Sequence, residues 1–199
     1  MEIPDARLRR LFDRLSGRPH FGSEPEPLAG RTEAAVALIL RASAELELLL
    51  IKRAESERDP WSGHVALPGG RRDAEDANLA ETAIRETAEE TAVELSSSGW
   101  PLGRLERVVP SHPNLPPITI MPYVFGVPEG IEANADSAEV DEVLWVALPV
   151  LLDPQTRGTT TIRMPEGPTD FPCYRVDGHV IWGLTFRILS EFSKLAGGL

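Results

Sequence analysis

Apolar residues recur along the chain with two spacings, one helical and one typical of buried strands. Residues 5–15 carry apolar side chains at helical spacing, which predicts a short amphipathic helix. The apolar stretches 34–40 and 46–52 are divided by a short polar segment, and their length predicts a buried pair of strands. Between the helix and the first strand, residues 17–30 are rich in proline and glycine and indicate a linker.

The rest of the chain alternates between strand-like runs and helical ones. A polar loop at 54–64 precedes a brief strand at 65–67, and a helix is predicted over 78–92. Further strands are predicted at 104–109, 118–127, 140–146, 159–164 and 172–176. A helical turn at 148–152 and a closing helix at 182–195 complete the pattern, which favours a mixed α/β domain.

The composition restricts what this chain binds. Its 199 residues, 42% of them apolar, suffice for one domain with a real core. A formal net charge of −11 argues against a general nucleic-acid or anionic-membrane binder, because phosphate would be repelled overall. Cys173 is the only cysteine, which excludes an intramolecular disulfide. No apolar run approaches the roughly 20 residues that span a bilayer, and no signal peptide is recognisable, so we expect a cytoplasmic protein.

Three glutamates share one face of the helix predicted over 78–92. At 100° per residue, Glu89 and Glu90 both fall within about 60° of Glu86. The opposite face carries residues suited to packing, namely Ala80, Ile84, Ala88 and Thr91. Acids at this spacing repel one another, and a divalent cation reverses that sign because hard ions prefer several oxygen ligands. Taken alone, three such acids are more typical of a solvated surface, so the flanking residues decide.

Those flanking residues resemble the Nudix box. Leu67-Pro68-Gly69-Gly70 precedes the helix, which then reads Arg85-Glu86-Thr87-Ala88-Glu89-Glu90-Thr91-Ala92-Val93. The box is a Gly, then a Glu, then Arg-Glu-x-x-Glu-Glu-x-Gly-aliphatic, so the resemblance covers residues 69–93. It implies a Nudix fold, an α/β/α sandwich around a mixed β-sheet. Here residues 1–30 would form an N-terminal helical extension with its linker, and residues 31–199 the Nudix domain.

The resemblance also assigns roles to the matching positions. It implies that Glu86, Glu89 and Glu90 bind Mg²⁺ or Mn²⁺, with the carbonyl of Gly70 as a backbone ligand. Arg85 would orient the carboxylates by charge-assisted hydrogen bonds. The ions would neutralise a diphosphate and activate a water for attack on phosphorus. Glu86, Glu89 and Arg85 are therefore the expected catalytic residues, with Glu86 our first choice as general base.

Two positions depart from the box. The family's upstream glutamate should fall at Ala77, but the turn holds one extra residue, so Asp76 is the expected stand-in. Ala92 replaces the glycine that follows the helix, and if that position needs a positive φ, alanine costs about 1 kcal/mol. Both departures support a different hypothesis, a non-catalytic Nudix-fold module that binds a nucleotide or a partner protein. The retained triad of repulsive glutamates argues against it.

The stretch before the box resembles the upstream signature of Nudix coenzyme A diphosphatases. It runs Leu49-Leu50-Ile51-Lys52-Arg53-Ala54, then Arg58, Gly63 and Leu67-Pro68-Gly69-Gly70. Leu67 stands where the signature has Phe and Ala54 where it has Ser, and one residue is added between Arg58 and Gly63. The resemblance implies hydrolysis of coenzyme A or an acyl derivative to 3′,5′-ADP and a 4′-phosphopantetheine. ADP-ribose and NADH are the alternative substrates.

A locally cationic region agrees with an anionic substrate. Residues 52–72 hold five basic side chains in an otherwise acidic chain: Lys52, Arg53, Arg58, Arg71 and Arg72. The planar fork of arginine can donate two hydrogen bonds to a phosphate. We therefore expect Arg53, Arg58 and Arg71 to bind substrate, with His64 as a further candidate. Each of them is also compatible with an ordinary loop residue.

Other polar residues stay open between substrate contact and a structural role. Trp61, His112 and Asn114 are loop candidates for substrate contact, whereas His179 and Trp182 are expected to pack beneath the last helix. Three acids are more typical of a solvated edge strand than of further metal ligands: Glu139, Asp141 and Glu142. The expected partner is a small nucleoside diphosphate derivative, with no nucleic acid and no membrane, and a homodimer is a hypothesis.

Overall fold

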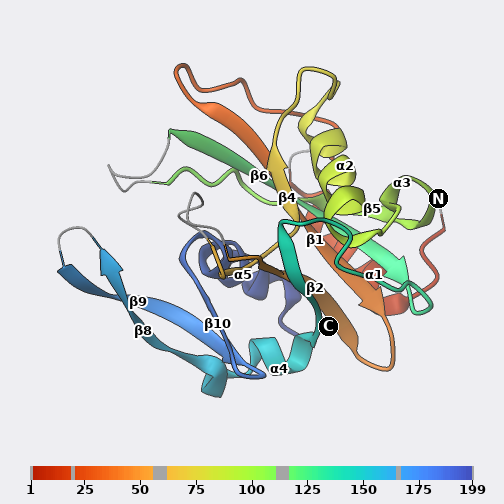
Figure 1. Cartoon of the computed structure of the whole chain (residues 1–199). Helices are drawn as coiled ribbons and strands as arrows, with labels where there is room; N and C mark the ends of the chain where they lie inside the picture. The colour runs from red at the N-terminus through yellow and green to blue at the C-terminus, as the bar shows by residue number, and fades with distance from the viewer. Residues whose placement is uncertain (1, 19–20, 56–61, 111–116, 165–166, 199) are drawn as a thin grey trace.

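The computed structural model describes residues 2–18, 21–55, 62–110, 117–164 and 167–198 (Figure 1). Its helices are α1 (Ala6–Ser16), α2 (Leu79–Thr91), α3 (Leu95–Ser98), α4 (Leu148–Leu152) and α5 (Gly183–Ala196), with a 3-10 turn η1 (Pro154–Thr156). Its strands are β1 (Thr32–Ala42), β2 (Leu46–Arg53), β3 (Val65–Ala66), β4 (Gly69–Arg71), β5 (Trp100–Arg104), β6 (Ile118–Pro128), β7 (Val140–Ala147), β8 (Arg157–Met164), β9 (Gly167–Val176) and β10 (His179–Trp182).

The strands form a larger mixed sheet and a smaller antiparallel one. In the larger sheet the order is β3-β2-β1-β6-β5, with β4 paired to β1 and β7 paired to β2. Only the pair of β1 and β6 is parallel among these, running from Thr32 opposite Ile118 to Ala42 opposite Pro128. The smaller sheet has the order β10-β9-β8. The predicted mixed sheet is confirmed.

Helices cover both faces of the larger sheet. Because side chains alternate along a strand, β1 contributes to two separate cores. Leu38 and Leu40 belong to the core that includes α1 and α5, while Ala37 and Ile39 belong to the core that includes α2 and α3. Figure 1 shows α2 and α5 on opposite sides of the sheet. The predicted α/β/α sandwich is thereby confirmed.

The N-terminal helix is part of the first core. Asp5 caps α1 by accepting hydrogen bonds from the backbone N–H groups of Arg7 and Leu8, as the helix start requires. Three leucines at helical spacing are almost fully buried: Leu8, Leu11 and Leu15. A Cβ on Gly126 would lie 2.7 Å from Leu8 Cδ1, and one on Gly103 2.7 Å from Leu15 Cβ. Two glycines therefore allow α1 to lie directly on the sheet.

The segment after α1 packs on the other face. Phe21 meets the rings of Tyr123 and Phe125 edge-on, with centroids 5.1 and 5.3 Å away. Further along, the carbonyl of Glu26 accepts a hydrogen bond from Arg107 Nη1 at 2.9 Å. The described part of this proline- and glycine-rich stretch therefore contacts the rest of the domain.

Several predicted elements need correction. The strand predicted at 104–109 is wrong, because β5 ends at Arg104 and beyond it only Val108 forms an isolated bridge, to Ile120. The strands β4 and β10 and the short helix α3 were not predicted. β4 contains two glycines and has no alternating side chains, so its extended form depends on pairing with β1.

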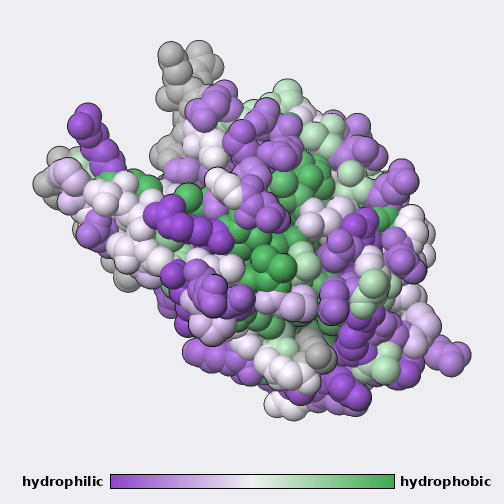
Figure 2. All heavy atoms as spheres, turned by 90° about the horizontal axis from the view of Figure 1, so that it is seen from below, coloured by the Kyte–Doolittle hydropathy of each residue, from purple (hydrophilic) through white to green (hydrophobic). Residues whose placement is uncertain are grey.

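The smaller sheet projects from the body of the molecule. In Figure 1 the β8–β9 hairpin extends to one side, while β10 lies against β3 at the edge of the larger sheet. α4 lies at the bottom, and seen from below, apolar side chains gather in the middle of this face within a hydrophilic frame (Figure 2). In the ranges that the structure describes, no helix combines the length and the apolar character that crossing a bilayer requires.

Candidate active site

Helix α2 carries the glutamates, and capping at both ends fixes its position. The side chain of Asn78 accepts a hydrogen bond from the backbone N–H of Glu81 at 3.0 Å, which is a standard N-cap. Glu24, from the segment after α1, accepts a hydrogen bond from the N–H of Leu79. A carboxylate is favoured at this end of a helix by the helix dipole. The helix ends at Thr91, and Ala92 caps it in the left-handed conformation, with a φ of 56° and a ψ of 17°.

The packing face of α2 differs in part from the prediction. Ala80 and Thr91 are buried as expected, but Ile84 and Ala88 are only half-buried. Glu90 was expected on the same face as Glu86 and Glu89. It is buried, with only 4% of its surface exposed. The reason is β4, which packs against α2 and offers a backbone without side chains at two glycines. The three carboxylates thus differ in environment, because Glu86 is half-buried and Glu89 exposed.

Glu90 is a buried carboxylate with limited compensation. Its Oε2 accepts a hydrogen bond from the N–H of Gly69 at 2.8 Å, and its Oε1 lies 3.9 Å from Arg53 Nη1. Burial raises the pKa of Glu90 to about 7, and the charge of Glu86 adds to that rise. The contacts with Gly69 and Arg53 oppose it only in part.

Glu86 fills the space that Gly70 leaves. A Cβ on Gly70 would lie 2.4 Å from both Cδ and Oε1 of Glu86, so any side chain at position 70 would displace the carboxylate. Burial raises the pKa of Glu86, and the charges of Glu89 and Glu139 act in the same direction against the lowering effect of Arg85. Gly70 and Glu86 therefore face each other across the junction of β4 and α2.

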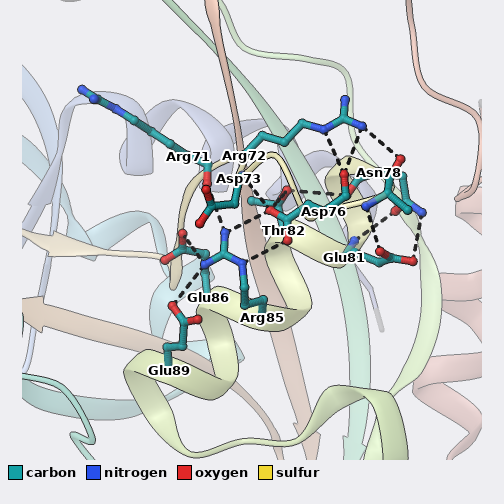
Figure 3. Close-up of polar contacts among 11 residues, drawn as sticks. Arg71, Arg72, Asp73, Asp76, Asn78, Glu81, Thr82, Arg85, Glu86 and Glu89 are labelled. Carbon is teal, nitrogen blue, oxygen red and sulfur yellow. Dashed lines mark hydrogen bonds and ion pairs between the residues drawn. The ribbon is translucent and has the colours of Figure 1, made fainter.

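Arg85 connects the carboxylates to the turn before the helix (Figure 3). Nε and Nη2 donate to the two oxygens of Asp76, each at 3.0 Å, and Nη2 also donates to the carbonyl of Arg71 at 3.2 Å. Nη1 lies 3.0 Å from Glu86 Oε1 and 3.1 Å from Glu89 Oε2. These five contacts equal the number of N–H groups on a guanidinium. The expected orienting role of Arg85 agrees with this geometry.

Asp76 anchors the other side of Arg85. Besides that bidentate pair, its Oδ2 accepts hydrogen bonds from the N–H of Asp73 and the hydroxyl of Thr82, both at 2.9 Å. The Arg85 guanidinium, with these donors, lowers the pKa of Asp76 to about 2 despite burial. The extra residue in the turn therefore leaves an acid in contact with the arginine of the box.

The expected substrate-binding residues are separated in space. Arg53 reaches the glutamates, since its guanidinium lies between Glu90 and Glu139, 3.6 Å from Oε2 of the latter. Arg71 is exposed, and in Figure 3 its side chain points away from the glutamates, while its carbonyl binds Arg85. His64 lies beside Trp182 instead, with ring centroids 4.8 Å apart. Four further candidates fall outside the described residues: Arg58, Trp61, His112 and Asn114.

Glu139 lies at the site, although its sequence context favoured a solvated edge strand. It precedes β7, whose first residue pairs with Arg53, and this register brings its exposed carboxylate to the site. The two neighbouring acids behave as an edge-strand surface, because Asp141 pairs with Lys52 at 2.6 Å and Glu142 lies 3.8 Å from His179. The position of Glu139 depends on the pairing of β2 with β7, which cannot be inferred from the sequence pattern alone.

The donors suit a divalent cation in kind, although they do not converge as they stand. Among the residues that the structure describes, no three acidic, histidine or cysteine side chains form a group that could hold a metal ion. Arg85 draws Glu86 and Glu89 to itself, and Glu90 turns to Gly69. Carboxylate oxygens are nevertheless the ligands that hard divalent ions prefer. Burial raises the pKa of Glu86 and of Glu90, and a nearby positive charge would act against that rise.

Comparison with known proteins decides the family. A family model described as the NUDIX domain matches residues 30–162, two thirds of the chain. The chain belongs to the Nudix family. It is accordingly a Nudix hydrolase, a metal-dependent enzyme that hydrolyses phosphorus anhydrides. The non-catalytic hypothesis loses its two supports, because Asp76 holds Arg85 and Ala92 adopts the left-handed conformation directly.

Three relatives show how far the likeness extends. The mitochondrial coenzyme A diphosphatase NUDT8 of Homo sapiens is 32% identical over 197 residues, covering 95% of this chain and 76% of that one. The uncharacterized protein C14C4.10c of Schizosaccharomyces pombe is 37% identical over 111 residues, covering 54% of this chain, which spans only 34% of that relative. The NUDIX domain of Shewanella oneidensis NrtR, solved with ADP ribose, shares the fold with a TM-score of 0.56 and 20% identity, covering 88% and 92% of the two chains.

Proposed function

We propose that this Nudix hydrolase cleaves the diphosphate bond of coenzyme A or its acyl derivatives, giving 3′,5′-ADP and a 4′-phosphopantetheine. The observation that carries the proposal is Arg53. It belongs to the stretch that resembles the upstream signature of coenzyme A diphosphatases, and its guanidinium lies beside Glu90 and Glu139. The human relative, which aligns with 95% of the chain, bears the name of such a diphosphatase and supports the same substrate.

The proposed reaction assigns each side chain a task. Arg85 holds Glu86 and Glu89 in fixed positions, and Asp76 holds Arg85. Arg53 offers its fork to a phosphate oxygen of the substrate. Glu86 takes the proton from the water that attacks phosphorus. Mg²⁺ or Mn²⁺, held by Glu86, Glu89, Glu90 and the carbonyl of Gly70, would neutralise the diphosphate and lower the pKa of the water.

A substrate panel tests the proposal. The purified chain is incubated with coenzyme A, acetyl-coenzyme A, ADP-ribose and NADH, each with Mg²⁺ or Mn²⁺, and products are identified by mass. We expect 3′,5′-ADP from the first two at rates well above the others. Cleavage of ADP-ribose or NADH with coenzyme A spared would overturn the substrate and leave the hydrolase.

A variant pair separates this site from contaminating activity. Glu89→Gln removes one charge from the cluster and should lower turnover by roughly 100-fold. Glu94→Gln changes an exposed glutamate beyond the end of α2 and should leave turnover unchanged. Equal activity in both variants would contradict the assignment of Glu89.

A homodimer and a cytoplasmic location stay predictions of the sequence.

A further inference from the structure

A cavity of about 300 Å³ lies between the edge of the larger sheet and the smaller sheet. Lys52 and His64 border it from β2 and the start of β3, and Ile162, His179 and Trp182 border it from β8 and β10. Its volume is at the lower limit for ligand pockets, which suits one moiety of a large substrate rather than the whole of it. The glutamates of α2 do not take part in it.

The lining of this cavity differs in its polar groups from the acidic chain around it. The chain has 31 acidic residues, yet the cavity is lined by three basic side chains, Lys52, His64 and His179, and by no acidic side chain among the residues that the structure describes. Asp141 and Glu142 contact Lys52 and His179 from outside the lining. Such a lining favours an anionic group over a neutral one.

Trp182 gives the cavity an aromatic wall. Its ring meets His64 edge-on at 4.8 Å and Phe171 at 5.3 Å with an interplanar angle of 45°, so two neighbours fix its orientation. The side chain remains half-exposed and lines the cavity. A rigid, half-exposed indole is a suitable platform for stacking a nucleobase. The strand that carries His179 and Trp182 does contact the last helix, as predicted, and both residues also line the cavity.

The cavity lies next to the candidate active site along one pair of strands. The N–H of Arg53 donates to the carbonyl of His64 at 3.0 Å, which continues the pairing of β2 with β3. Opposite residues in such a ladder have Cα atoms about 5 Å apart. The Arg53 guanidinium points to Glu90, whereas the neighbouring Lys52 lines the cavity. Because successive side chains of a strand point to opposite faces, a substrate with its diphosphate at Arg53 would have to pass around the end of β2 to place a terminal group in the cavity.

We propose that this cavity binds the nucleotide half of the substrate, with the purine base against Trp182 and the 3′-phosphate near Lys52, His64 and His179. The identity of that half as 3′-phosphorylated adenosine rests on the proposed function. A pantetheine arm is neutral and has no aromatic ring, so it would use neither the basic groups nor the indole.

Direct binding of the nucleotide alone tests the inference without turnover. Dissociation constants of 3′,5′-ADP, 5′-AMP and 4′-phosphopantetheine are measured by calorimetry on the unmutated chain and on variants. Trp182→Leu should weaken both nucleotides about tenfold or more, and Trp182→Phe should restore most of the affinity because it keeps an aromatic face. Lys52→Gln should weaken 3′,5′-ADP but not 5′-AMP.

Matched controls make the outcome decisive. Lys194→Gln removes a lysine that is likewise paired with an acid, on the exposed side of α5, and should change neither constant. Thermal unfolding checks that each variant is folded, and Lys52→Gln changes a side chain that is not part of the core. Unchanged binding of both nucleotides in Trp182→Leu and Lys52→Gln, or weaker binding of 4′-phosphopantetheine instead, overturns the inference. Nucleotide binding that depends on Trp182 in a chain that spares coenzyme A supports the cavity and rejects only the proposed substrate.

Discussion

Arg85 is the residue on which the geometry of the acidic cluster depends. Its five contacts join Glu86 and Glu89 on the helix to Asp76 and the Arg71 carbonyl in the preceding turn. Lysine carries the same charge, but its ammonium has three N–H groups on one atom and cannot reach acceptors on both sides. The orientation of the carboxylates should therefore be sensitive to the shape of this cation rather than to its charge.

We predict that Arg85→Lys lowers turnover by roughly 10- to 100-fold, the range found when a residue that orients metal ligands is replaced. The midpoint of metal titration should rise in parallel. Steady-state kinetics with increasing Mg²⁺ measure both. Arg163→Lys, at an exposed position of β8, serves as the control and should change neither value. Full activity in Arg85→Lys would show that the guanidinium fork is dispensable.

Ala92 stores backbone strain at the end of α2. Its φ of 56° lies in the left-handed region, which costs an L-residue with a side chain about 1 kcal/mol. We predict that Ala92→Gly raises the free energy of unfolding by about that amount, as measured by urea denaturation. Ala88→Gly, within the same helix, should lower it by about 1 kcal/mol. The opposite signs exclude a general effect of glycine.

At the scale of elements, the junction between α2 and the turn before it depends on pH. Asp76 has a pKa of about 2 in the folded chain, against 3.8 when free. Since the folded value is the lower one, its contribution to stability is complete above pH 4. It is lost as the pH falls from about 4 towards 2.

We predict that Asp76→Asn destabilises the chain at pH 7 by on the order of 2 kcal/mol. The gap to the unmutated chain should narrow below pH 4 and close near pH 2. Chemical denaturation at a series of pH values measures it. Asp170→Asn, at an exposed position of β9, is the matched control and should cost much less. A gap that stays constant from pH 7 to pH 2 would show that Asp76 acts through packing rather than charge.

The elements that the sequence could predict are those whose side chains carry the pattern. Helix α2 and the strands β1, β2, β6 and β7 have apolar residues at the spacing their surroundings need, and their predicted ranges are close to the observed ones. β4 consists of Gly69-Gly70-Arg71, whose extended form comes from the partner strand. β5 contains Pro101 and Gly103, both poor strand formers, so the apolar residues beyond it misplaced the prediction.

The same limit applies to the candidate site. The helix alone places Glu86 and Glu89, and the box motif identifies Arg85. The burial of Glu90, the approach of Arg53 and the position of Glu139 depend on strand pairing between distant segments. No periodicity along the chain encodes such a pairing.

For the whole molecule, α1 is a part of the core, although it precedes the region matched by the NUDIX family model. We predict that Leu11→Ala costs about 2–5 kcal/mol of unfolding free energy, because Leu11 is fully buried. Phe12→Ala removes a larger side chain at the next position, but that side chain is 40% exposed and its loss should cost far less. Urea denaturation of both variants compares them. Equal costs would contradict the packing of α1 against the sheet.

Strand β1 pairs with three other strands. Its partners are β2 and β4, which run antiparallel to it, and β6, which runs parallel. Thr32 pairs with Ile118, so this pairing can form only after the glutamate-bearing helix α2 has been synthesised. Pairings so distant in sequence are slow to form. During synthesis, a nascent chain that has exposed residues 86–90 possesses the proposed metal ligands before the sheet on which their helix packs is complete. We therefore expect tight metal binding to appear only once residue 128 has left the ribosome.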